Sequence, residues 1–211
     1  MTLVGIDLAG PSNQADTALV AIRADGTYAW HAIGLGDREI LERLASVDAL
    51  EAVALDAPLS YNPGGGDRPA DAELRSILAG AGGASNSVMP PTMTRMAYLT
   101  LRGISVARLL RHTVGMAAAD ILEVHPASAL ILRGAPADDV GAIKESDAAR
   151  RRIVDWLRRK TDLKEVPDGV ADSDHLIAAA AAALAGVGWH RGTPAFEHPA
   201  DPPVHPHAVV A

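Results

Sequence analysis

The sequence contains no cysteine among its 211 residues. This absence excludes disulfide frameworks, thiolate zinc sites and cysteine nucleophiles. No segment reaches about 18 apolar residues without a charge, and no basic stretch precedes the first apolar run, so we expect neither a membrane span nor a signal peptide. The formal net charge of −7 argues against tight non-specific binding of duplex nucleic acid, although a local basic surface remains compatible with it. We expect one soluble, cytoplasmic domain.

The first part of the chain carries strand signals, followed by a helix and another strand. Asp25 and Gly26 separate the second and third apolar runs, and this pair predicts a tight hairpin in which both residues take positive φ. Asp37 is the expected N-cap of the helix. The fourth run should pair in parallel with an earlier strand, because a helical crossover precedes it. The four expected strands are 3–9, 17–24, 27–33 and 52–57.

The rest of the chain predicts further helices and one more strand. Residues 62–90 are rich in glycine and serine, but no Walker or G-x-G-x-x-G spacing follows a strand there, so we do not expect a nucleotide loop. A helical pattern runs to about His112 with a break at Gly103. The other expected elements are a strand at 120–126 and helices at about 146–160 and 172–186. These elements predict an α/β domain over residues 1–188 and an irregular, Pro/His-rich tail over 189–211.

Three of the expected strands carry an acidic residue close to their C-terminal ends. These residues are Asp7, Asp56 and Glu123, and Asp172 and Asp174 begin the alanine-rich helix. In a mostly parallel sheet the C-terminal strand ends lie side by side, in the crevice where open α/β sheets bind ligands. Taken singly, a strand-end aspartate is typical of a turn, and Asp172 or Asp174 is typical of a helix N-cap. Taken together, the acids predict one site.

Clustered carboxylates repel one another and raise each other's pKa unless a cation compensates. Oxygen ligands without cysteine suit hard ions, so Mg²⁺ or Mn²⁺ is the expected cofactor. Two such ions about 4 Å apart orient a water molecule and stabilise the leaving oxygen of a phosphodiester. This chemistry explains why an apolar strand would carry a carboxylate.

Five segments, in order, resemble the domain of unknown function 429 family, whose members are described as predicted nucleases of the ribonuclease H fold. They are "GIDLAG", "ALDAPLS", "PPTMTRMAYLTLRG", "LEVHPAS" and "DSDHLIAAAAAALAG", and the resemblance covers Val4 to about Gly186. It implies a ribonuclease H-like mixed central sheet with flanking helices. It also implies metal-binding and catalytic roles for the acids that match the family's motifs, Asp7, Asp56, Glu123 and Asp174, with Asp172 as a further ligand.

One departure concerns the start of the last helix. The family often shows D-D-x-x-D-A there, whereas this chain has Ser173 and His175. The choice between Asp172 and Asp174 as the metal ligand therefore stays open at this point.

Basic and histidine residues are candidates for substrate binding. Arg95 lies in the family-like "PPTMTR" segment, and a surface arginine at a helix N-terminus is the competing interpretation. His125 follows Glu123 by two positions and is either a general base or a structural histidine. Basic residues also crowd 150–160, where a solvated helix face competes with a phosphate-binding surface. The tail histidines are expected to lie in a solvated, disordered end.

The sequence thus predicts a divalent-metal-dependent nuclease that hydrolyses DNA or RNA. Asp7, Asp56 and Asp174 would bind the metal, and Glu123 would complete its ligands or position water. The alternatives are a nucleotide-binding or phosphotransfer protein of the actin and sugar-kinase type and a catalytically inactive binding module. The phosphotransfer alternative predicts a duplicated domain and phosphate loops, for which 211 residues leave little room.

Overall fold

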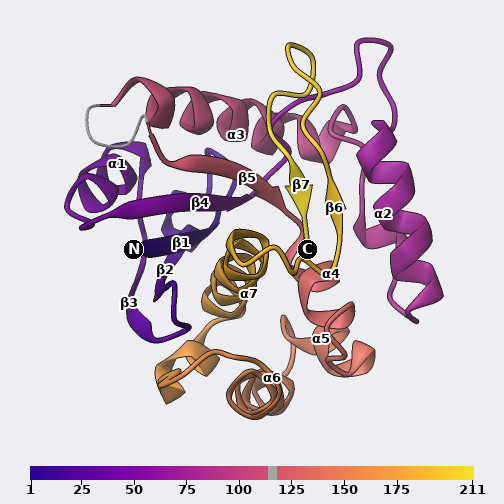
Figure 1. Ribbon diagram of the computed structural model, residues 1–211. Helices are drawn as coiled ribbons and strands as arrows, with labels where there is room; N and C mark the ends of the chain where they lie inside the picture. Colours follow the sequence, from indigo (N-terminus) through magenta and orange to yellow (C-terminus); the bar gives the residue numbers. More distant parts are fainter. Residues whose placement is uncertain (114–117) are drawn as a thin grey trace.

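The computed structural model describes residues 1–113 and 118–211. Within these residues, one mixed sheet of seven strands has the order β3-β2-β1-β4-β5-β7-β6 (Figure 1). The strands are β1 (Thr2–Asp7), β2 (Ala18–Arg23), β3 (Tyr28–Ile33), β4 (Leu50–Asp56), β5 (Asp120–Val124), β6 (Glu197–His198) and β7 (Val209–Val210). The helices are α1 (Asp37–Ala45), α2 (Pro69–Gly80), α3 (Thr94–His112), α4 (Pro126–Ile131), α5 (Ala137–Ala142), α6 (Asp147–Lys160) and α7 (Asp174–His190).

Helices cover both faces of the sheet, and the alternation of side chains along β1 shows how. Leu3 points to the face covered by α7 and belongs to the larger hydrophobic cluster. Val4 and Ile6 point to the opposite face, where they share a second cluster with Ile40 of α1 and Val106 of α3. Figure 1 shows α1 and α3 on one side of the sheet and α7, with α6 outside it, on the other. The two clusters thus make a three-layer α/β domain.

The alanine-rich helix α7 lies directly against β1. A Cβ atom at Gly5 would come within 2.1 Å of the carbonyl oxygen of Ala179 and 2.3 Å of the backbone nitrogen of Ala183. Only a glycine in β1 facing small residues in α7 allows this approach, because backbone atoms cannot move aside as a flexible side chain can. The close approach fixes the start of α7 relative to the end of β1.

The first four strands and their pairing confirm the sequence predictions. β1 pairs antiparallel with β2 and parallel with β4, and β5 pairs parallel with β4. The hairpin between β2 and β3 differs from the prediction. Only Gly26 takes a positive φ in this hairpin. The N–H of Arg23 donates to Thr27 O, and the N–H of Gly26 donates to Arg23 O. This is a three-residue loop that ends in a glycine bulge, so Asp25 needs no left-handed conformation.

Two helix predictions are corrected. Helix α3 is continuous through Gly103, where a Cβ atom would lie 2.8 Å from the carbonyl oxygen of Pro58, so this glycine serves close packing rather than a helix break. Helix α1 has Gly36 at its N-cap and no side-chain cap. Asp37 instead accepts a hydrogen bond from Arg102 Nε at 2.8 Å. Both differences come from tertiary contacts that local patterns do not encode.

The chain after Trp189 belongs to the sheet and is not an irregular tail. β7 pairs parallel with β5, and β6 pairs antiparallel with β7. The last residue, Ala211, is fully buried, and its N–H donates to Phe196 O at 3.0 Å. Strands of two residues leave almost no pattern in a sequence, which is why they escaped prediction. Along the described part of the chain, no helix is long and apolar enough to cross a membrane.

Candidate functional site

Asp7 and Asp56 occupy the last positions of neighbouring parallel strands. The two residues are register partners across β1 and β4, so their Cα atoms lie about 4.8 Å apart, the usual spacing between strands. Both residues stand at the C-terminal edge of the sheet and are largely, but not fully, buried. The structure thus brings together the two acids that the sequence placed at the ends of separate strands.

The two carboxyl groups perturb each other. Burial raises the pKa of Asp56 well above its usual range, and the charge of Asp7 and a hydrogen bond to it raise this pKa further. Burial also raises the pKa of Asp7, while contact with His175 opposes the rise. Of the two groups, Asp56 is therefore the one whose protonated form is favoured more strongly. A bound cation would favour the ionised form of both groups.

The N-terminus of α7 supplies the other members of the site. Ser173 is the N-cap, and its hydroxyl oxygen accepts a hydrogen bond from the N–H of His175 at 3.1 Å. His175 Nδ1 lies 2.7 Å from Asp7 Oδ2, and His175 Nε2 lies 3.8 Å from Asp174 Oδ1. The hydrogen bond to Asp7 raises the pKa of His175. Because Ser173 performs the capping, the carboxylate of Asp174 is not used as a helix cap.

The structure distinguishes between the two aspartates at this helix start. Asp172 ends the short 3₁₀ helix Asp168–Asp172 and is exposed. It lines a surface pocket beside α6 together with Arg151 and Arg158. Asp174, in contrast, is close enough to Asp7 for its charge to raise the pKa of Asp7. Asp174 therefore belongs to the acidic site and Asp172 lies outside it.

Glu123 lies near Asp56 but is bound by an arginine. Arg68 Nη1 donates to Glu123 Oε2 at 2.7 Å, and Arg68 Nη2 donates to Glu123 Oε1. The N–H of Leu59 also donates to Oε2 at 2.7 Å. Arg68 makes a further ion pair with Asp71, and both arginine partners are buried. With both oxygens used in this way, Glu123 is not available as a metal ligand in the described arrangement.

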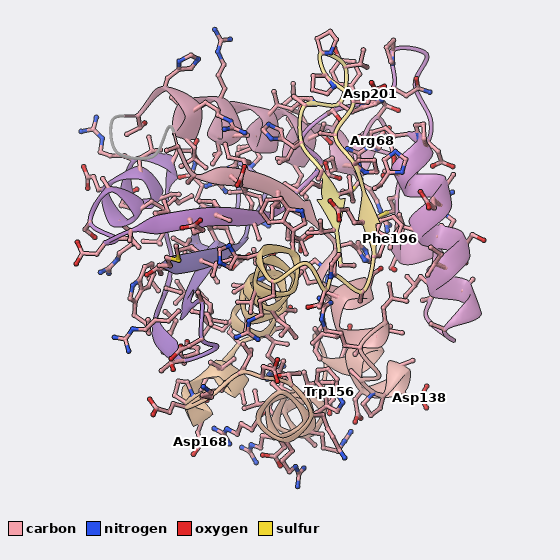
Figure 2. All side chains as sticks on the ribbon, in the orientation of Figure 1. Arg68, Asp138, Trp156, Asp168, Phe196 and Asp201 are labelled. Atoms are coloured by element: carbon pink, nitrogen blue, oxygen red, sulfur yellow. The ribbon has the colours of Figure 1, made fainter. Side chains whose placement is uncertain are left out.

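Two buried arginines hold the loops that follow the paired aspartates. Arg68, which Figure 2 labels beside α2 and the β6–β7 hairpin, holds the loop after Asp56 through Glu123 and its bond to Leu59. On the other strand, Arg102 Nη1 donates to Ala9 O at 2.6 Å and to the hydroxyl oxygen of Thr17 at 2.9 Å. Each aspartate thus stands at the start of a loop that a charged hydrogen-bond donor keeps in place.

The two predicted substrate-binding residues differ in their surroundings. His125 is the N-cap of α4: its Nδ1 accepts from the N–H of Ser128 at 3.2 Å, and its Nε2 lies 3.2 Å from Ser87 O. Burial lowers its pKa, which suits a neutral structural histidine. Arg95 is exposed on the first turn of α3, and its Nε lies 3.0 Å from the sulfur of Met89. It is free to meet a ligand.

A small cavity opens beside Asp56. Its volume is about 50 Å³, and its lining includes Asp56, Glu123, Arg68 and the methionines Met89 and Met96. A water molecule needs about 10–15 Å³ of such space, so the cavity has room for water but not for a nucleotide. Any larger ligand would have to bind over the open edge of the sheet.

The family of the chain follows from its sequence as a whole. The family model described as "Protein of unknown function (DUF429)" matches residues 5–203, which include every member of the acidic site. The chain belongs to this family. No curated protein and no solved structure matches the chain.

The site fits a divalent cation in part. Across residues 1–113 and 118–211, no group of three or more His, Asp or Glu side chains is arranged to hold a metal ion. The pair Asp7 and Asp56 nevertheless has the right chemistry, because it offers adjacent carboxylate oxygens. The positive charges that act on them are those of His175, which is bonded to Asp7, and Lys144, which lowers the pKa of Asp56. The side chain of Asp7 is 15 % exposed and that of Asp174 is 23 % exposed, so solvent ions can reach both.

Three residues of the site's surroundings were missed by sequence reasoning. His175 enters the sequence analysis only as a departure from the family pattern, and the pairing of Arg68 with Glu123 leaves no local signal because the two lie 55 positions apart in the chain. Arg102 is a buried arginine of α3. Its helical spacing from Val106 and Leu110, both buried, places it on the inner face of α3 and was the available signal.

Proposed function

We propose that the protein is a divalent-metal-dependent nuclease with a ribonuclease H-like fold, which hydrolyses phosphodiester bonds of DNA or RNA in the cytoplasm. The observation that carries the proposal is the pair Asp7 and Asp56, in register at two parallel strand ends with raised pKa values. Burying two carboxylates together is unfavourable without a cation. Such an arrangement is typical of functional sites rather than of stable cores.

The fold part of the proposal rests on topology. The order β3-β2-β1-β4-β5, with β2 antiparallel to β1 and with β4 and β5 parallel, agrees with the ribonuclease H opening that the family resemblance implied. Helix α7 on β1 brings the last acid to the same edge. The short strands β6 and β7 extend the sheet beyond this arrangement.

The roles of the side chains follow from their contacts. Asp7, Asp56 and Asp174 would hold Mg²⁺ or Mn²⁺, which supplies Lewis acidity and lowers the pKa of bound water. His175 orients the carboxylate of Asp7 through the 2.7 Å contact. Glu123 acts as a positioning residue, because it fixes the N–H of Leu59 and thereby the loop after Asp56.

A cleavage assay tests the proposal. Single-stranded, duplex, hybrid and four-way nucleic acids are incubated with the protein and Mn²⁺, beside the variants D7N and D56N. We expect each variant to lose more than about 100-fold in rate, since removing even the hydrogen-bond partner of a metal ligand costs about 10–100-fold. D155N, which removes a half-exposed carboxylate on α6, is the matched control and should cut normally.

Two outcomes would contradict the proposal. One is cleavage by D7N and D56N at the parental rate, which would assign the activity to a contaminant. The other is the absence of cleavage of every substrate by a parent protein that binds Mn²⁺ and one of the nucleic acids, which would favour the inactive binding module.

A further inference from the structure

A second pocket lies at the opposite end of α7 from the acidic site. Its volume is about 290 Å³, and its lining includes Arg133, Lys160, Arg191, Gly188 and Thr193. Gly188 follows Asp174 by 14 positions in the same helix, a distance of about 21 Å at the usual helical rise. The pocket is therefore separate from the proposed nuclease site.

Arg133 is the least satisfied cation in this pocket. Its Nη1 donates to Ala129 O at 3.1 Å, but its Nη2 is buried and has no hydrogen-bond partner among the described residues. Burial lowers the pKa of this guanidinium. A buried donor without a partner costs about 1–3 kcal/mol and calls for a ligand.

The surrounding backbone does not satisfy this arginine. The last carbonyl groups of α7 already accept N–H bonds: Gly188 O accepts from Thr193 N at 2.8 Å, and Val187 O accepts from Arg191 N at 3.1 Å. Gly188 also leaves the space that Arg133 occupies, because a Cβ atom there would lie 2.6 Å from Nη2. The guanidinium thus lies against the helix without capping it.

The charges around the pocket are unbalanced. Arg133, Lys160 and Arg191 face a single carboxylate, that of Asp162. Asp162 is paired with Arg191 at 2.9 Å, and no ion pair forms at Arg133 or Lys160 among the described residues. Two positive charges are therefore left over. A phosphate monoester carries about −1.5 to −2 charges at pH 7 and would balance them.

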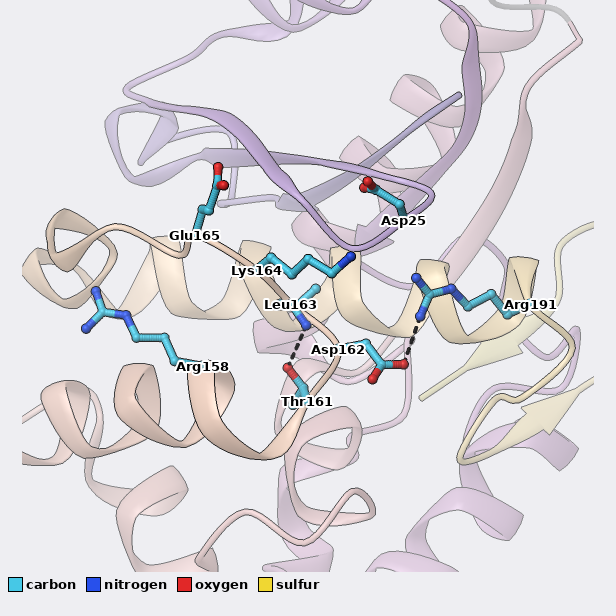
Figure 3. Close-up of a pocket in the computed structure, with 8 residues that line it drawn as sticks. All are labelled: Asp25, Arg158, Thr161, Asp162, Leu163, Lys164, Glu165 and Arg191. Carbon is cyan, nitrogen blue, oxygen red and sulfur yellow. Dashed lines mark hydrogen bonds and ion pairs between the residues drawn. The ribbon is translucent and has the colours of Figure 1, made fainter.

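A neighbouring pocket provides the contrast. It has a volume of about 530 Å³ and shares Thr161, Asp162 and Arg191 with the pocket at Arg133. Figure 3 shows Arg191 reaching Asp162 there, with Lys164, Arg158, Asp25 and Glu165 around them. Its three cations face three carboxylates, and Arg158 is paired with Asp168 outside the lining. Of these two pockets, the one at Arg133 combines excess positive charge with an unsatisfied donor.

We propose that the pocket formed by Arg133, Lys160 and Arg191 binds a phosphate dianion, either free or as the terminal group of a small phosphate ester. Arg133 Nη2 and Lys160 Nζ supply the charge, and Thr193 closes the pocket beside Gly188. The volume is at the lower limit of ligand pockets, about 300 Å³, which suits a small molecule rather than a polymer. This inference is independent of the proposed nuclease activity.

Titration calorimetry at constant ionic strength tests the site with the full chain. The probes are inorganic phosphate and a nucleoside 5′-monophosphate, and the tighter of the two identifies the source of the phosphate group. We expect saturable binding, weakened about 10-fold or more in both R133Q and K160Q, since one hydrogen bond to a charged group contributes about 1.5–3 kcal/mol. Binding of the monoester should weaken below about pH 6, where it gains a proton.

The controls separate this site from general charge attraction and from the acidic site. R38Q removes one exposed positive charge from α1 and should leave the affinity within about two-fold. D56N should abolish nuclease activity but keep phosphate binding. Absence of binding for both probes, or equal affinity in the parent and in R133Q and K160Q, overturns the proposal. Because Lys160 is exposed, K160Q keeps the test valid even if R133Q is unstable.

Discussion

The strand-end acids of the central sheet have two different environments. At the ends of β1 and β4, Asp7 and Asp56 stand side by side without an arginine, and burial raises the pKa of both. Near the end of β5, Glu123 forms an ion pair with the buried guanidinium of Arg68. The same sequence feature thus gives a pair of adjacent carboxyl groups with raised pKa values in one place and a buried arginine–carboxylate ion pair next to it.

The difference separates a carboxylate with a structural role, Glu123, from carboxylates that are available to a ligand, Asp7 and Asp56. A buried carboxylate that is held by an arginine and a backbone N–H fixes a loop. A buried carboxylate beside another carboxylate weakens the fold and is retained where a cation is to bind. The two environments therefore predict opposite effects of substitution on stability.

The largest effect on stability is expected at Arg68. R68M leaves the carboxylates of Glu123 and Asp71 buried without a counter-ion, so the free energy of unfolding should fall by about 3–5 kcal/mol. Chemical denaturation measures the loss. The side chains of Arg68 and Glu123 are only 4 % and 8 % exposed, which is why we assign them the full cost of a broken buried pair.

The pair formed by Arg75 and Asp67 is the matched control. Its geometry is as good, at 2.6 Å, but the side chains are 28 % and 34 % exposed. R75M should therefore cost no more than about 1 kcal/mol. Equal losses in R68M and R75M would remove the distinction between the compensated acid and an ordinary surface pair.

Substitution of Asp56 is expected to raise the free energy of unfolding, whereas substitution of Arg68 lowers it. The raised pKa means that the folded state binds a proton more tightly than the unfolded chain, so this group lowers stability as the pH rises above about 4. D56N should raise the free energy of unfolding at pH 7, without divalent ions, by about 1 kcal/mol. This corresponds to about 2–4 °C in melting temperature. The gain should vanish near pH 4, and a less stable D56N at pH 7 would show that the pair is not strained.

The smallest effect is expected at His175. Its pKa is raised by Asp7, so the pairing stabilises the fold fully below about pH 6.5 and is lost as the pH rises through the raised pKa. The side chain is 32 % exposed, and solvent screening limits the contribution to at most about 1 kcal/mol. Thermal melts from pH 5 to 9 should show a decline that H175Q lacks. The same decline in H175Q would assign it to another group.

Much of this arrangement could be predicted from the sequence, and particular residues show where prediction stopped. Periodic apolar runs located β1, β2, β3, β4 and β5, and acids at their ends located Asp7 and Asp56. Partners that lie far away in the chain leave no local pattern: Arg68 reaches Glu123 across 55 positions, and His175 reaches Asp7 across 168. Strands as short as β6 and β7 form only because β5 offers them an edge.

The most direct test of the central claim is Mn²⁺ binding to the parent protein, D56N and D155N, measured by calorimetry at pH 7.5. The account predicts saturable binding in the parent and in D155N and its loss in D56N, because Asp56, unlike Asp155, belongs to the strand-end pair of carboxyl groups. Undetectable binding in the parent, or unchanged binding in D56N, would contradict it.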